Sequence, residues 1–159
     1  MTTHADIESL LSDYAAAWAA NDPDKIASYW DQSAETHFYK AEEFDDYFAT
    51  MAEIKNYWAH NEGFHEAIKL GFSLVRVSPL AGGISLVITR MRWDIRFASD
   101  ATNADGTGFA SAGKAMGGDN HVLALVTGTA DGPRFIGWSE TPDAPVKYIW
   151  RLYEEQARL

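Results

Sequence analysis

The segment from Gly82 to Phe97 constrains the fold more strongly than any other part of the sequence. A Gly-Gly turn leads into side chains that alternate between two faces, which is typical of a long β-strand. One face is largely apolar and carries Val87, Thr89, Met91, Trp93, Ile95 and Phe97. The other begins apolar and becomes charged, through Ile84, Leu86, Ile88, Arg90, Arg92, Asp94 and Arg96. The first half of the strand is apolar on both faces, so we expect other parts of the protein to pack against both. In the second half, the charged face must contact water, a partner chain or a polar cavity.

Hydrophobic periodicity predicts three helices and a short strand before this segment. The first apolar stripe has spacings of three and four and consists of Ile7, Leu10, Leu11, Tyr14 and Trp18. It predicts a helix that ends near Asn21. Asp22 is the expected N-cap of a second, short helix, and Pro23 is its expected first residue. A short strand is expected over 34–39. A third helical stripe consists of Phe44, Tyr47, Phe48, Met51, Ile54 and Trp58.

The rest of the chain is expected to be mostly sheet. Strands are predicted from 68 to 78, 84 to 97, 120 to 127 and 134 to 140, with a small-residue loop over 98–118 that is either a lid or mobile. A closing helix follows Asp143, with Val146, Ile149, Trp150 and Tyr153 facing inward. This order indicates one α+β domain, 1–159, in which a cone-shaped, curved antiparallel sheet wraps around the N-terminal helices and leaves a cavity.

Composition excludes several classes of partner. The net charge of -10 argues against nucleic acid and anionic membranes, because both bind cationic surfaces. The absence of cysteine, together with an N-terminus that lacks a signal-peptide pattern, favours the cytoplasm. The 6 Trp, 7 Tyr and 8 Phe are enough to line an apolar pocket as well as a core.

Two stretches resemble the nuclear-transport-factor-2-like superfamily, which includes ketosteroid isomerase, scytalone dehydratase, limonene epoxide hydrolase and the SnoaL-type polyketide cyclases. Residues 14–30, YAAAWAANDPDKIASYW, look like its first two helices, and residues 131–140, DGPRFIGWSE, look like its final strand. Tyr14 matches the oxyanion-hole tyrosine of ketosteroid isomerases. Their two aspartates would fall at about Phe38 and Asn120, so the resemblance does not imply steroid isomerisation.

The resemblance to limonene epoxide hydrolase implies a different catalytic set. That enzyme carries an Arg-x-Asp on a central strand and an Asp after Gly-Trp-x on the last strand; here the matching positions are Arg92, Asp94 and Glu140. Two carboxylates bridged by a guanidinium can serve as base and acid. The same three residues also fit a surface or dimer-interface set of ion pairs. Tyr14 and His121 complete the candidate catalytic residues, although a core tyrosine and a structural histidine are the plain alternatives.

The candidate ligand-binding residues are aromatic and polar side chains expected near the cavity: Trp18, Trp30, His37, Tyr57, Trp58, Asn120 and Trp138. Packing in the core is the alternative for the aromatic ones. His60, Glu62, His65 and Glu66 match no metal motif, and no nucleotide-binding or serine-nucleophile motif is present. Neither a metal nor a cofactor is therefore expected.

The sequence thus predicts a small-molecule-binding protein, with a cofactor-independent acid–base enzyme as the first interpretation. Its reaction would be an isomerisation, dehydration, cyclisation or epoxide hydrolysis of an apolar substrate. The alternative is a non-catalytic ligand-binding or assembly domain. Both interpretations allow a homodimer formed through the sheet.

Overall fold

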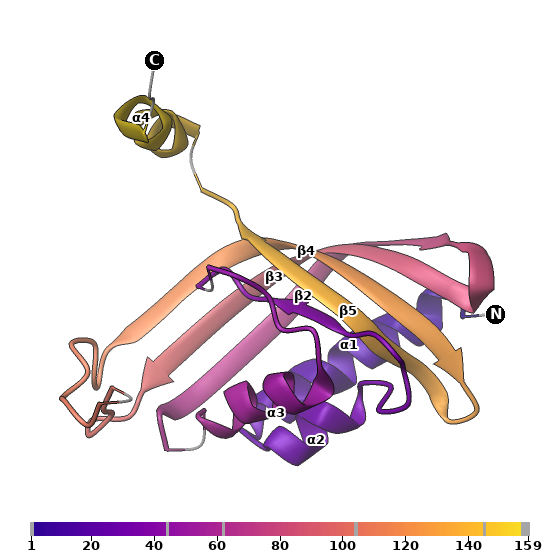
Figure 1. Cartoon of the computed structure of the whole chain (residues 1–159), viewed down its shortest axis with the longest axis horizontal. Coiled ribbons are helices and arrows are strands. Elements are labelled where there is room, and N and C mark those ends of the chain that lie inside the picture. The colour runs from indigo at the N-terminus through magenta and orange to yellow at the C-terminus, as the bar shows by residue number, and fades with distance from the viewer. Residues whose placement is uncertain (1, 44, 62, 104, 145, 157–159) are drawn as a thin grey trace.

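A curved sheet covers a layer of helices in the computed structural model, which describes residues 2–43, 45–61, 63–103, 105–144 and 146–156 (Figure 1). The helices are α1 (His4–Ala19), α2 (Pro23–Ser28), α3 (Met51–Ala59) and α4 (Val146–Gln156). The strands are β1 (Phe38–Lys40), β2 (His65–Pro79), β3 (Ile84–Phe97), β4 (Ala115–Thr129) and β5 (Gly132–Pro142). The predicted α+β class, with N-terminal helices beneath the sheet and a C-terminal helix, is confirmed.

The five strands lie in the order β1-β5-β4-β3-β2. Strands β2 to β5 form the expected antiparallel meander, and β1 adds a parallel pair with β5, so the sheet is mixed. Register shifts between Ser73 and Arg76 and between Leu125 and Val126 mark bulges. Because a bulge bends its strand and increases the local twist, these shifts help the sheet to curl around the helices.

Helix ends are set by local hydrogen bonds that the sequence encodes. Thr3 and Asp6 form a capping box at the start of α1, and Thr50 and Glu53 form another at α3. Asp22 accepts from the backbone N–H of Lys25 at the start of α2. α1 ends as expected, because Asn21 adopts a positive φ of 50° that stops the helix.

The turn before β3 follows the sequence prediction. Gly82 and Gly83 have φ angles of 71° and 75°, a backbone region that side chains with a Cβ rarely adopt. The strand after this turn presents its apolar face to the helices, where Val87, Thr89 and Met91 are buried. The charged residues of β3 therefore lie on the outer, convex face.

Several sequence expectations need correction. The third helix begins at Met51, because Thr50 supplies the cap, and Tyr47 remains 54% exposed before it. Phe44 lies outside the described residues. Helix α4 lies beyond the end of β5, apart from the other helices (Figure 1). Trp150 and Tyr153, expected to face inward, are 66% and 64% exposed, because no described element packs over them. The side chains of Val146 and Ile149 lie outside those the structure describes.

Large aromatic rings fill the space between the helices and the sheet. Trp30 packs on Trp58 with ring centroids 5.6 Å apart and on Phe135 at 5.8 Å, and all three rings are fully buried. Aromatic rings at such separations pack closely without stacking face to face. This cluster joins the segment after α2, helix α3 and the inner face of β5.

We expect Trp58→Ala to lower the free energy of unfolding by about 3–5 kcal/mol, because it empties a large, fully buried volume. Trp150→Ala removes the same ring from an exposed position of α4 and should change it by less than about 0.5 kcal/mol. Urea denaturation of both variants followed by circular dichroism measures the difference. Equal effects would show that the buried ring is not a main support of the fold.

Candidate active site in the aromatic cavity

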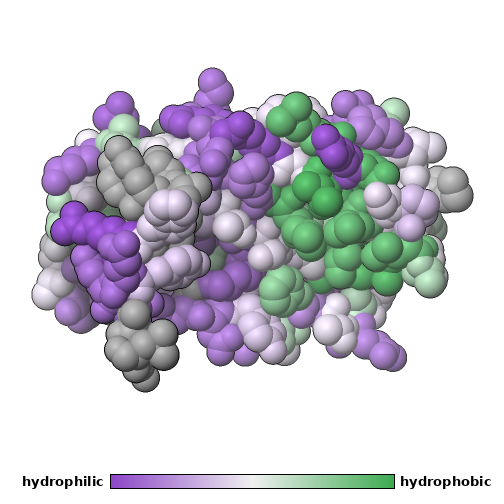
Figure 2. Space-filling model, turned by 90° about the horizontal axis from the view of Figure 1, so that it is seen from above, coloured by the Kyte–Doolittle hydropathy of each residue, from purple (hydrophilic) through white to green (hydrophobic). Residues whose placement is uncertain are grey.

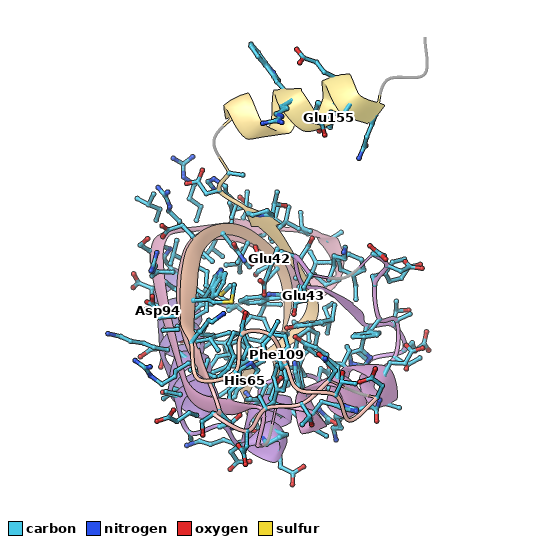
Figure 3. The ribbon with its side chains drawn as sticks, turned by 90° about the vertical axis from the view of Figure 1, so that its left-hand side faces the viewer. Glu42, Glu43, His65, Asp94, Phe109 and Glu155 are labelled. Carbon is cyan, nitrogen blue, oxygen red and sulfur yellow. The ribbon has the colours of Figure 1, made fainter. Side chains whose placement is uncertain are left out.

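A cavity of about 1100 Å³ lies between the inner face of the sheet and the helices. Side chains from α1, β1, α3 and all four long strands line it. Figure 3 looks toward it along the strands, with Glu42, Glu43, His65 and Phe109 inside the curve of the sheet and Asp94 outside. This volume is large enough for a drug-sized organic molecule.

Nine Phe, Tyr and Trp side chains line the cavity. The deeper rings belong to Tyr14, Trp18, Tyr39, Tyr57, Trp93 and Trp138. Three phenylalanines pack together at one end, with the centroid of Phe109 lying 5.0 Å from that of Phe64 and 4.9 Å from that of Phe97. Phe109 comes from the loop between β3 and β4, whose backbone is tied to this end by the hydrogen bond from Ala98 to the Phe64 carbonyl, 3.0 Å. The loop therefore covers part of the cavity.

Glu140 is the most deeply placed carboxyl group of the cavity. It follows Trp138 by two residues on β5, so both side chains point to the inner face. The indole N–H of Trp138 donates to Oε1 of Glu140 at 2.7 Å, and the amide of Asn120 donates to Oε2 at 2.9 Å. Two donors thus hold the carboxyl group in one orientation.

Asn120 is buried behind Glu140 and is itself oriented by Trp93. The indole N–H of Trp93 donates to Oδ1 of Asn120 at 3.3 Å. An indole can only donate, so the amide oxygen faces Trp93 and the amide N–H₂ faces Glu140. Gly118 permits this arrangement, because a Cβ at that position would lie 3.1 Å from the Trp93 ring.

Burial raises the pKa of Glu140 to about 7, although the hydrogen bonds from Trp138 and Asn120 oppose the shift. The negative charges of Glu43 and Glu42 raise it further. An apolar surrounding disfavours the charged form of a carboxyl group. At neutral pH the group is therefore divided between acid and base, which suits proton transfer in both directions.

Tyr14 lines the same cavity from α1 and is 1% exposed. Burial holds the pKa of its phenol well above the usual range, against nearby indole N–H groups of Trp18 and Trp30 that lower it. The charge of Glu140 also raises it. Tyr14 consequently remains a neutral hydrogen-bond donor at any physiological pH.

Two further carboxylates, Glu42 and Glu43, enter the cavity from the turn after β1. The hydroxyl of Tyr57 donates to Glu43 Oε1 at 2.5 Å. Burial, followed by the charge of Glu43, raises the pKa of Glu42. Sequence reasoning missed both residues, because two glutamates after a strand look like an ordinary solvated turn.

The structure does not bring the expected catalytic set together. Arg92 and Asp94 lie on the outer face of β3, each side chain half exposed, and pair with each other at 2.6 Å. Arg92 also lies 3.6 Å from Asp119 on β4. Their alternation with Met91 and Trp93, which face the cavity, places them on the opposite side of the sheet. The expectation that Arg92, Asp94, Glu140 and Tyr14 converge on one cavity is wrong for the first two.

His121 also lies on the outer face. It follows the inward-facing Asn120, pairs in register with Arg90, and its ring lies 3.9 Å from Asp143. Arg90 itself forms an ion pair with Asp143. These residues form an exposed ion-pair group with Arg92 and Asp94, so the plain alternative of surface ion pairs describes their placement.

The expected ligand-binding residues divide into two groups. Trp18, Tyr57 and Trp138 line the cavity. Asn120 does not line it but donates a hydrogen bond to Glu140, which does. Trp30 and Trp58 belong to the packed core, and His37 is buried with Nε2 2.7 Å from the Asp31 carbonyl oxygen. The core alternative therefore describes the two tryptophans, and His37 has a structural hydrogen bond.

No group of three His, Asp or Glu side chains that would hold a metal ion occurs among the described residues; Glu62, one of the four residues compared with metal motifs, lies outside them. Within the same part of the chain, every helix is too short or too polar to cross a membrane.

Comparison with known proteins supports the fold. No family model matches the sequence, and no curated protein matches it. A provisionally assigned dehydratase of the NTF2-like family from Streptomyces avermitilis has 15% identity and a TM-score of 0.68, over 88% of this chain and 95% of that one. A provisionally assigned scytalone dehydratase from Novosphingobium aromaticivorans has 12% identity and a TM-score of 0.68, over 87% and 83%. An uncharacterised protein with a cystatin-like fold from Caulobacter vibrioides has 14% identity and a TM-score of 0.66, over 95% and 96%.

The raised pKa of Glu140 makes stability depend on pH. The folded protein holds this proton up to a pKa of about 7, whereas an unperturbed glutamate releases it near 4.5. The folded state therefore binds the extra proton between these values, and stability falls as the pH rises through that window, by up to about 3 kcal/mol, before levelling off.

Urea titrations between pH 4.5 and 8 should show this fall in the wild type and its loss in Glu140→Gln. Asp94→Asn, which removes an outer carboxylate, should keep it. Carbon-13 NMR of labelled glutamate should also show one side chain titrating near pH 7 that disappears in Glu140→Gln. A wild type in which every glutamate titrates below pH 5.5 would contradict the assignment.

Proposed function

On the premise that the chain has the nuclear-transport-factor-2-like fold, we propose that it is a small-molecule enzyme that catalyses proton transfer in its aromatic cavity without a cofactor. The observation that carries this proposal is Glu140, a carboxyl group fixed by two N–H donors in an apolar cavity with a pKa of about 7. The similarity to provisionally assigned dehydratases agrees with such chemistry but is too distant to assign a reaction.

In this proposal Glu140 acts as the general base. Its carboxylate takes a proton from a carbon of the bound substrate and returns it, as the acid, to a neighbouring carbon or to a departing oxygen. The first outcome is an isomerisation and the second is a dehydration. A desolvated carboxylate with a pKa near neutrality is a better base than one in water and is still present in its charged form.

Tyr14 would supply the complementary role. A neutral phenol donates a hydrogen bond to the substrate oxygen that gains negative charge as the proton leaves carbon, which lowers the barrier. Because burial keeps the Tyr14 phenol protonated, it remains a donor throughout. Asn120 and Trp138 position Glu140 and need not touch the substrate.

The wall of the cavity favours an apolar substrate. Apolar side chains that line it include the rings of Trp18, Trp93 and Trp138 and the aliphatic side chains of Ile68 and Met91. Burying apolar surface supplies the binding free energy.

A general proton-abstraction probe tests the base directly. Nitrobenzisoxazole opens when a base removes its ring C–H proton and the N–O bond breaks, giving a coloured cyanonitrophenolate. We expect the wild type to accelerate this reaction with a rate that rises with pH through an apparent pKa near 7. Glu140→Gln should lower the rate by about 100-fold or more.

Asp94→Asn is the matched control, because it neutralises a carboxylate on the outside of the same sheet. It should keep the wild-type rate and pH profile. Equal rates for wild type and Glu140→Gln would reject Glu140 as the base. A rate lost in both variants would place the reaction outside the cavity.

We also propose that the chain forms a homodimer through the outer face of the sheet. The half of this face near the β2–β3 turn is apolar, and Figure 2 shows it as a continuous hydrophobic surface beside a polar half. The patch comprises Ile84, Leu86, Ile88, Leu123 and Leu125 from β3 and β4. Ile88 and Leu123 face each other in register and are 43% and 47% exposed. A contiguous apolar patch is typical of an interface, and a two-fold axis would cover it with its own copy.

Leu123→Lys should therefore weaken the dimer by tenfold or more, since it places a charge in the apolar contact. Met116→Lys is the control, because Met116 lies on the inner face of the same strand and is 49% exposed. Sedimentation velocity of the wild type and both variants reports the association. A wild type that remains a monomer at 100 μM would contradict the proposal.

A further inference from the structure

The charges that line the cavity all have one sign in the described part of the chain. Four acidic residues line it, Glu42, Glu43, Asp100 and Glu140, and no lysine or arginine does among the described residues. His65, which also lines the cavity, adds little positive charge, because burial lowers the pKa of its ring. The basic side chains of β3 point to the opposite face, where they pair with Asp94, Asp119 and Asp143.

This arrangement leaves a charge imbalance inside an apolar space. Burial is the main cause that raises the pKa of Glu42 and of Glu140; the charge of Glu43 raises both further, and the charge of Glu42 also raises the pKa of Glu140. Their hydrogen-bond partners are the neutral groups of Asn120, Trp138 and Tyr57. Glu140 is largely buried and Glu42 is partly buried, whereas Glu43 and Asp100 are more exposed. A buried carboxylate usually pairs with a cation, and among the described residues no basic side chain pairs with Glu140.

The aromatic wall fits the same conclusion independently of the acids. Six Trp and Tyr rings line the cavity, Tyr14, Trp18, Tyr39, Tyr57, Trp93 and Trp138. The faces of such rings carry negative potential and attract organic cations, most strongly when water is excluded. Ring faces beside carboxylates are suited to an ammonium group that has apolar substituents.

We propose that the cavity selects an apolar ligand bearing one positive charge, an amine or a quaternary ammonium, with its cationic group near Glu42, Glu43 and Glu140 and its apolar body against the tryptophans. This inference rests on the proposed function and specifies its substrate class. An organic cation is favoured over a metal ion, because no set of metal-binding side chains occurs in the described residues.

Three probes of one shape and different charge test the selection. The protonated amine 1-naphthylmethylammonium, the neutral alcohol 1-naphthylmethanol and the anion 1-naphthoate are titrated into the protein by calorimetry at pH 8, where Glu140 is ionised. We expect the cation to bind roughly tenfold tighter than the alcohol and the anion to bind weakest. At pH 5.5, where Glu140 is protonated, the advantage of the cation should shrink.

Glu42→Gln removes one of the acids and leaves the carboxyl group of Glu140 in place. It should reduce the advantage of the cation several-fold and leave the affinity of the alcohol unchanged. Asp94→Asn removes the same charge from the outer face and should leave both affinities unchanged, which separates a local effect from the general field of an acidic protein (Figure 3).

The outcomes separate this inference from the proposed function. If the alcohol binds as tightly as the cation, and both depend on Trp138, the charge selection is rejected while the cavity remains a ligand site. If Asp94→Asn weakens the cation as much as Glu42→Gln does, the attraction is general and the inference also fails. If no probe binds, the cavity is not a ligand site, and both proposals are rejected.

Discussion

The alternation of side chains along β3, β4 and β5 is the constraint on which the site depends. The inner face must bury Val87, Val122 and Phe135 against the helices, and all three are buried almost completely. Because the period of a strand is two, this requirement fixes the side on which the other residues of β3 and β4 lie. On β5 the bulge opposite Leu125 and Val126 reverses the alternation after Phe135. The pairing of Trp138 with Ala124 and of Glu140 with Val122 sets the side of these two residues. Asn120, Trp138 and Glu140 are thereby placed inside, and Arg92, Asp94 and His121 outside.

The polar groups of the cavity wall are stable there because they form hydrogen bonds with one another. Trp93 orients Asn120, and Asn120 and Trp138 together hold Glu140. Each donor in this network lies on the inner face of the same sheet, so the antiparallel register sets their separations. The network fixes the direction of the carboxyl group but supplies no positive charge, which is why the pKa of Glu140 rises while its geometry stays defined.

The two faces of the sheet have different electrostatic characters. On the outer face, arginines and aspartates form ion pairs, and the surrounding water weakens the interactions between these charges. On the inner face, carboxyl groups lie among aromatic rings without a basic partner in the described residues. The outer ion pairs therefore belong to the surface of the fold, and the inner carboxyl groups define the chemistry proposed for the cavity.

The sequence alone determined the Asp22 cap of α2, the turn at Gly82 and Gly83, and the two faces of β3, since each depends on residues close together in the chain. It also placed Tyr14, Trp138 and Glu140 among the candidates. It did not determine which face of β3 is concave, because periodicity relates neighbours on one strand and does not say where distant helices pack. Nor did it show that Glu42 and Glu43 enter the cavity. That placement follows from the parallel pairing of Phe38 with Gly137, a contact between distant segments that only the folded sheet creates.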